Sequence, residues 1–277
     1  MKENKRKSRI WLIAALVFAL GAIALGIWLY LHSSLGQPEP SQGEQTESMP
    51  VPALEPFESR TDIQDQAVTE PSPSTDEAEP PPEPYESPVD FASIWAVNED
   101  VIAWLYIPGI EMSYPILMDP DDNTYYLTHD AEGNSSSAGA LFIEDYNHPD
   151  FQDMCTVVYG HRMYDGDMFG VLQSSYSDEE SLEKNQDIGV YLPDREIHYR
   201  VFAAVPYDDA HILYYNDFDD QLSYRKFING IYAENGLNAV QVLSQKPVYG
   251  DRLLILSTCL WGDKNSRYLV LAKELSE

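Results

Sequence analysis

Leu253-Leu254-Ile255-Leu256-Ser257-Thr258-Cys259 is the stretch that decides the fold of this 277-residue chain. Its apolar run is typical of a buried β-strand, and its last residue carries a thiol at the strand end. A second apolar run ends in the same way, at Gly160-His161, and Arg267 opens the last apolar segment eight residues after Cys259. Side chains at strand ends are held accurately yet stay accessible. A nucleophilic thiol needs that access and a neighbouring cation.

Short apolar segments bounded by turn residues recur through the C-terminal two thirds of the chain, which favours a β-barrel or sandwich. We predict strands at 101–107, 112–117, 140–143, 156–159, 188–192, 196–205, 253–257 and 268–272. Turns are expected at Pro108-Gly109 and at Pro193-Asp194, the second of which makes a hairpin.

Two segments break the strand pattern and predict helices. Near the start of the domain, Phe91, Ile94 and Trp95 indicate a short amphipathic helix. Further on, apolar residues recur at helical spacing after a run of acids suited to a helix N-terminus. These apolar residues are Leu222, Phe227, Ile228 and Ile231. The second helix is therefore inserted between the hairpin and the penultimate strand.

The N-terminal region predicts a membrane anchor. Residues 1–9 carry five basic side chains against one acid, and the 22 residues from Ile10 to Leu31 contain no charge and no proline. A helix of that length covers the roughly 30 Å core of a bilayer. A cleaved signal peptide has a shorter apolar region and a small-x-small cleavage site, and a buried helix would usually be shorter. Basic flanks stay inside the cell. We therefore expect a cytoplasmic flank at 1–9, a single membrane span at 10–31 and an extracellular remainder.

Residues 32–88 have the composition of a tether. They hold 12 of the chain's 19 prolines, and 13 acids against one base, Arg60. Such a segment cannot bury enough apolar surface to offset its chain entropy, and its charges repel one another. We predict a disordered spacer that holds the following domain clear of the membrane.

Residues 89–277 predict one folded domain, since about 190 residues suffice for a sizeable core. The domain has 32 acids against 11 bases, a net charge of −21. Nothing in it resembles the basic stripe of a nucleic-acid-binding protein, so nucleic acid is not expected as a partner. An acidic surface of this kind keeps an extracellular domain soluble.

Taken together, these residues resemble the sortase family over the whole of 89–277. The matching motifs agree in order and approximate distance; they are Trp104–Gly109, Pro115-Ile116, Tyr159–Met163, Leu256–Cys259 and Arg267. The inserted helix and the Leu-Ser-Thr-Cys sequence look most like class B. Leu260-Trp261-Gly262 and the short loop before Arg267 depart from that class, which leaves the substrate contacts at this rim open.

The resemblance implies an eight-stranded β-barrel enzyme, a cysteine transpeptidase without a cofactor. By this similarity, Cys259 attacks a threonine carbonyl in the sorting motif of a secreted protein and forms a thioacyl intermediate. His161 protonates the leaving amine and later deprotonates the incoming one. Arg267 donates hydrogen bonds to the oxyanion or to the peptide backbone. An amine of peptidoglycan, or of its lipid-linked precursor, resolves the intermediate, so that the secreted protein becomes attached to the cell wall.

Other polar and apolar side chains have weaker claims to a role. Ser257 and Thr258 either line the substrate groove or only pack the strand, and Tyr224 and Ile228 on the inserted helix are also explained by helix packing. Histidines without a motif are expected to be structural or on the surface; they are His129, His148, His198 and His211. No His/Cys pairing has the spacing of a metal site, so no metal is expected.

The chain has two cysteines, Cys155 and Cys259, and a disulfide between them has to be considered. Cys155 lies six residues before His161 on one strand, which is roughly 20 Å at strand rise. If His161 and Cys259 are neighbours, Cys155 cannot reach Cys259. We therefore predict that Cys155 is a buried core residue and that no disulfide forms.

Two alternative functions stay open. A cysteine endopeptidase of the papain type uses related chemistry, but it usually places its cysteine before its histidine, whereas His161 precedes Cys259. A catalytically idle adhesion or scaffold domain could keep the barrel. Such a domain would be expected to have lost the cysteine, histidine or arginine, and all three are present.

Overall fold

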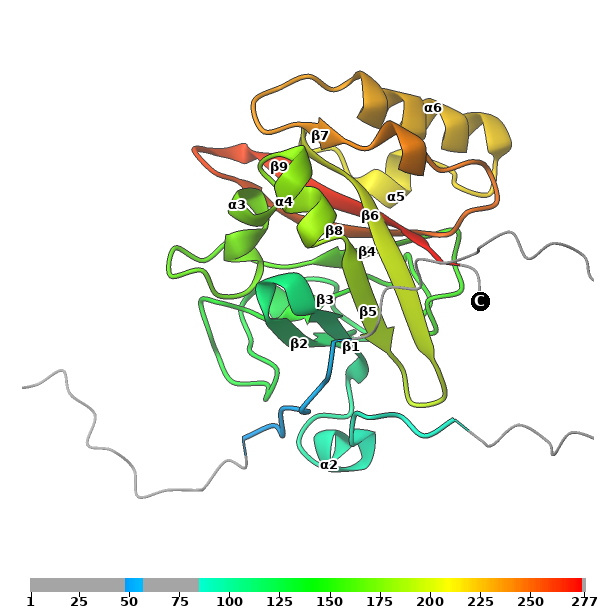
Figure 1. Cartoon of the computed structure of the whole chain (residues 1–277). Helices are drawn as coiled ribbons and strands as arrows, with labels where there is room; N and C mark the ends of the chain where they lie inside the picture. The colour runs from blue at the N-terminus through cyan, green and yellow to red at the C-terminus, as the bar shows by residue number, and fades with distance from the viewer. Residues whose placement is uncertain (1–47, 57–84, 276–277) are drawn as a thin grey trace, which may run out of the picture. The chain divides into compact units, whose positions relative to one another are not determined.

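The computed structural model describes residues 48–56 and 85–275, which belong to one compact unit, Ser48–Glu277 (Figure 1). The predicted flank at 1–9, the predicted span at 10–31 and most of the predicted spacer lie outside the described residues. Within the described ranges, no helix is long and apolar enough to cross a membrane.

The predicted eight-stranded barrel is confirmed. The strands are β1 (Val101–Ile107), β2 (Met112–Leu117), β3 (Leu141–Phe142), β4 (Cys155–Tyr159), β5 (Asp187–Tyr191), β6 (Glu196–Tyr207), β7 (Val240–Gln241), β8 (Leu253–Leu260) and β9 (Asp263–Glu274). They follow the order β5-β1-β2-β3-β4-β8-β9-β6-β7, and a further pairing of β5 with β6 closes a ring of eight strands. β7 adds to β6 outside that ring. The pairs β2–β3 and β4–β8 are parallel, and the other pairs are antiparallel.

Helices lie around the barrel (Figure 1). They are α2 (Phe91–Trp95), α3 (Leu172–Ser175), α4 (Glu179–Lys184), α5 (Ile212–Tyr215) and α6 (Gln221–Ala233). Single 3₁₀ turns occur at Pro108–Ile110, Tyr125–Leu127, Phe169–Val171 and Leu243–Gln245. The sequence predicted α2 and α6. It did not predict α3, α4, α5 or β7, which are two to six residues long; segments this short rarely show a clear period.

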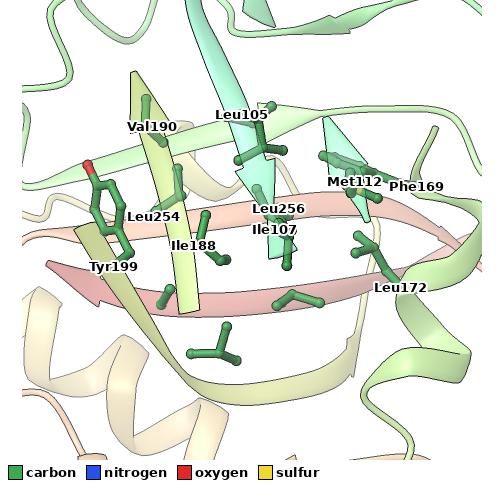
Figure 2. Packing of buried hydrophobic residues seen from close by; sticks show 14 of the residues in the cluster. Leu105, Ile107, Met112, Phe169, Leu172, Ile188, Val190, Tyr199, Leu254 and Leu256 are labelled. Carbon is green, nitrogen blue, oxygen red and sulfur yellow. The ribbon is translucent and has the colours of Figure 1, made fainter. Parts of the chain in front are cut away.

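Strand β8 is buried on both faces, which explains its uninterrupted apolar sequence. Its inward side chains, Leu254 and Leu256, meet residues of β1 and β5 inside the barrel (Figure 2). Its outward side chains, Leu253 and Ile255, pack in a second cluster that includes the apolar face of α6. Burial of each such aliphatic side chain contributes about 1.5–3 kcal/mol. β8 is therefore the central strand of the domain, and its end is held rigidly.

Helix α6 begins where the sequence indicates but presents a different face. The Asp220 carboxylate accepts a hydrogen bond from the Ser223 N–H at 2.8 Å and caps the helix. Leu222, predicted on the apolar face, is 77% exposed, so that assignment was wrong. The buried face instead begins at Tyr224, because positions 224, 227, 228 and 231 share one side of the helix.

Part of the predicted spacer contacts the barrel. Met49 is only 8% exposed and packs in a cluster with Val89 and Phe91. Its N–H donates to Glu132 Oε1 at 3.2 Å. Met49 and the half-buried Leu54 supply the apolar surface that the neighbouring prolines and acids lack.

A buried asparagine completes the sheet beside β4. Strand β3 pairs with β4 only at Phe142 and Tyr159. Further along β4, Asn147 Nδ2 donates to the Cys155 carbonyl at 2.8 Å, and Asn147 Oδ1 accepts from the Val157 N–H at 3.0 Å. The amide side chain thus makes the two hydrogen bonds that a neighbouring strand would otherwise make.

Candidate active site

Cys259 and Arg267 lie directly opposite each other on the antiparallel strands β8 and β9. Directly paired residues project from the same face of a sheet, so the thiol and the guanidinium share the outer face of the barrel. The hairpin closes through a tight turn, with Leu260 paired to Asp263 and Gly262 at φ 85°. Between Asp263 and Arg267, three residues of β9 form the register shift that brings Arg267 opposite Cys259.

His161 reaches the same edge of the barrel from β4, which runs parallel to β8. Tyr159 pairs with Ser257, and the Gly160 N–H donates to the Ser257 carbonyl at 3.2 Å. His161 Nε2 lies 2.8 Å from the Leu127 carbonyl oxygen. A carbonyl only accepts, so Nε2 carries a proton, and Nδ1 is the basic nitrogen of the neutral ring.

All three side chains line one cleft of about 250 Å³. Its other walls come from the loop before β3, from β3 and its C-terminal end, and from the segment between β6 and α5. The additional lining residues are Asn123, Thr124, Leu127, Phe142, Glu144, Tyr159, Gly160, Tyr207, Asp209, Ala210, His211, Ile212, Ser257 and Thr258. A thiol, an imidazole and a guanidinium on one cleft are the groups that acyl transfer through a thioester requires.

The four weaker candidates fall into two groups. Ser257 and Thr258 line the cleft, although each is only 3% exposed, and the buried Thr258 Oγ1 makes no hydrogen bond. Tyr224 and Ile228 are not among the residues that line it. Both belong to the buried face of α6, and the Tyr224 hydroxyl donates to the Asp251 carbonyl at 2.9 Å. Both side chains therefore take part in packing the helix on the barrel.

The structure adds a partly buried polar pair that the sequence did not indicate. His211 Nδ1 accepts the Tyr214 N–H at 3.1 Å, which leaves the proton on Nε2. Nε2 then donates to Glu144 Oε2 at 2.6 Å. We predicted His211 to be structural or on the surface, whereas it forms part of the cleft wall. No local motif marks the pair, because its members are 67 residues apart.

Tyr159 lies between this pair and the catalytic edge. Its hydroxyl is buried close to the Glu144 carboxylate but makes no hydrogen bond of normal geometry. Burial, and next the negative charge of Glu144, raise the pKa of Tyr159 well above its usual value. The phenol therefore stays neutral.

Both cysteines are free thiols, as predicted. Cys155 is buried at the start of β4, and burial raises the pKa of its thiol well above the usual value. A buried, protonated thiol is unreactive. Cys259 is the half-buried thiol that faces the cleft.

Gly139 packs against the His161 ring, and a residue with a side chain would collide with that ring and with the backbone. It has φ +62°, and a Cβ at this position would lie 2.5 Å from the Tyr126 carbonyl oxygen and 3.0 Å from His161 Cδ2. We expect Gly139→Ala to displace the histidine and lower kcat/KM for peptide cleavage about tenfold or more. It should also lower stability by about 1–3 kcal/mol. Steady-state kinetics and thermal unfolding measure the two effects.

Gly250 provides the matched control for that substitution. It has φ +109°, and a Cβ there would meet nothing within 4 Å. Gly250→Ala therefore carries backbone strain without the contact to the histidine. Equal activity in the two variants would show that Gly139 does not position His161.

The chain is similar to known proteins in both sequence and structure. The sequence model of the Sortase domain matches residues 105–275. Sortase B of Listeria monocytogenes is 30% identical over 172 residues, which cover 61% of this chain and 67% of that protein. The structure of a Staphylococcus aureus sortase B–substrate complex has a TM-score of 0.59 at 25% identity and covers 67% of this chain and 84% of that one. Sortase B from Bacillus anthracis, solved in complex with AAEK1, has a TM-score of 0.59 at 25% identity. The match covers 70% of this chain and 90% of that one.

The barrel and these matches define a sortase-type cysteine transpeptidase, an enzyme of the cell surface. The chain belongs to the sortase family. Within that family it is a class B sortase, as the resemblance in the sequence predicted.

Proposed function

We propose that this class B sortase cleaves the sorting motif of secreted proteins after a threonine and transfers the acyl group to an amine of peptidoglycan or of its lipid-linked precursor. The observation that carries the proposal is the meeting of Cys259, His161 and Arg267 on one cleft. In this reading Cys259 Sγ attacks the threonine carbonyl carbon, and the thiol proton passes to His161. The peptide C–N bond then breaks, and His161 delivers a proton to the departing amine.

The second half of the reaction reverses these roles. The acceptor amine attacks the thioester carbon, the C–S bond breaks, and the surplus proton of the amine passes to His161. Arg267, across the ladder from Cys259, has a planar fork of donors suited to an oxyanion or to a peptide carbonyl. The Leu127 carbonyl holds the imidazole in one tautomer for this exchange.

We further propose the chain organisation that the sequence indicates. Residues 10–31 anchor the enzyme in the cell membrane as a single span, with 1–9 in the cytoplasm. The spacer at 32–88 carries an extracellular catalytic domain at 89–277. The uncharged run and its basic flank support this arrangement.

The test uses the full chain with a panel of peptides that each contain a threonine followed by glycine or asparagine, with and without an added peptide amine. Mass spectrometry should detect an acyl adduct on Cys259, and with amine a new amide bond to the threonine carbonyl. The matched control peptide carries valine in place of threonine, which keeps the shape and removes the hydroxyl. Cleavage at a different bond would refute the threonine assignment. A folded chain that forms no adduct with any peptide would favour the idle scaffold.

A further inference from the structure

An arginine and two aromatic side chains form a stack beside the cleft, which we call the aromatic clamp: Arg162, Tyr164 and Trp261. The Arg162 guanidinium carbon lies 4.4 Å from the centre of the Trp261 ring and 4.9 Å from that of Tyr164. The two rings meet edge to face at 5.4 Å. Cation–π contacts of this kind are attractive and hold the guanidinium against the rings.

The clamp joins the segments that follow the catalytic imidazole and the catalytic thiol. Arg162 directly follows His161, and Trp261 lies two residues after Cys259. The Trp261 N–H donates to Gln173 Oε1 at 2.9 Å, which ties the β8–β9 turn to helix α3. None of the three clamp residues lines the cleft. The clamp is therefore a surface outside the cleft that adjoins the residues carrying the reacting groups.

The guanidinium of Arg162 has unused hydrogen-bonding capacity. Its Nε and Nη1 are buried under the rings and have no hydrogen-bond partner among the residues that the structure describes. No ion pair between described residues involves Arg162. The nearby acids serve their own loops: Asp165 Oδ1 accepts the Asp167 N–H, and Asp263 accepts from Asn265 and Ser266. A buried donor without a partner is destabilising, and a carboxylate ligand would remove that cost.

The rings can give a ligand access to these donors. Tyr164 is 81% exposed and Trp261 is 57% exposed, so either side chain can move without losing much buried surface. Large exposed aromatic rings also offer a flat face on which a peptide or sugar unit can pack. The arrangement suits a ligand that combines a carboxylate with such a unit.

We propose that the aromatic clamp binds the acceptor: a peptide amine of the wall precursor whose chain also carries a free carboxylate. This inference rests on the proposed function and names the acceptor class for the same site. The carboxylate pairs with the Arg162 fork, and the adjoining unit packs on Trp261. The amine is thereby held beside the thioester on Cys259. The amine forms the new C–N bond, the C–S bond breaks, and a proton passes from the amine to His161.

The decisive experiment offers two acceptors in competition to the acyl-enzyme of the full chain. Both are the same short lysine-containing peptide, one with a free C-terminal carboxylate and the other with a C-terminal amide. Because both compete for one acyl-enzyme, the product ratio does not depend on the acylation rate. We expect the unmodified chain to favour the carboxylate about tenfold, and Arg162→Gln to bring the ratio close to one. Arg225→Gln, the same charge change on the exposed face of α6, should keep the preference.

The possible outcomes distinguish a failure of the clamp assignment from a failure of the proposed function. An unmodified ratio near one, or a preference that survives Arg162→Gln, overturns the clamp assignment while leaving transpeptidation intact. If no peptide acylates Cys259, calorimetric titration of the full chain with the two acceptors still applies. Tighter binding of the carboxylate form, lost in Arg162→Gln, would support the clamp without the proposed function. Equal binding of both forms would overturn it.

Discussion

Cys259→Ala is expected to abolish acyl-enzyme formation and to lower turnover on the order of 10⁴-fold or more, since covalent catalysis is lost with its nucleophile. Within the described part of the chain, Cys259 is the thiol that faces the cleft. Intact-mass measurement after an acid quench distinguishes the acylated from the free enzyme. A fluorescence-quenched peptide gives the turnover rate.

Cys155→Ala is the matched control for that experiment. Cys155 lies on the strand next to β8 but is buried, and its raised pKa keeps the thiol protonated. We expect this variant to form the adduct and to lose about 1 kcal/mol of stability from the vacated core volume. An adduct on Cys259→Ala, or its absence from Cys155→Ala in a folded protein, would contradict the assignment of the nucleophile.

Arg267→Lys should lower kcat/KM about 10²- to 10³-fold although it keeps the positive charge. Arginine presents a planar fork of donors, whereas lysine presents a compact point charge that cannot make two parallel hydrogen bonds. Arg267 sits opposite Cys259 in the β8–β9 ladder, so its donors lie on the side where charge develops during attack. Steady-state kinetics separates two roles. A fall in kcat indicates oxyanion stabilisation, and a rise in KM alone indicates binding of the peptide backbone.

Arg200→Lys is the corresponding control, because Arg200 lies on the neighbouring strand β6 and pairs with Asp187 at 3.4 Å. This half-buried arginine is not among the residues that line the cleft, so activity should be retained within about twofold. Full activity in Arg267→Lys would show that charge alone is needed. Equal losses in both variants would point to a general effect on the barrel.

The sequence predicted the barrel because most barrel strands carry a local signal. β1 and β2 have the predicted bounds, and β8 and β9 only extend beyond theirs. The motif residues Cys259, His161 and Arg267 could likewise be found at strand ends. Their chain order, compared with a known family, then indicated which strands meet.

The remaining features depend on contacts between distant segments, which no local pattern records. The Glu144–His211 pair joins two loops, and the aromatic clamp joins two others. Leu222 was assigned to the wrong face because apolar character alone does not set the phase of a helix when a tyrosine can fill the buried position. The contact of Met49 with the domain was not predicted, because the average composition of a segment does not reveal a single apolar side chain that becomes buried.

The asparagine beside β4 has a consequence for how a guest peptide can be recognised. Extended peptides commonly bind proteins by joining the open border of a sheet. Here the ring of strands is closed, and where β3 stops short, the Asn147 amide already occupies the free carbonyl and N–H of β4. An incoming chain would have to evict a buried side chain to pair there. Selection of a guest beside β4 must therefore come from side-chain pockets and loop surfaces, which are the parts of a barrel that can change without disturbing its frame.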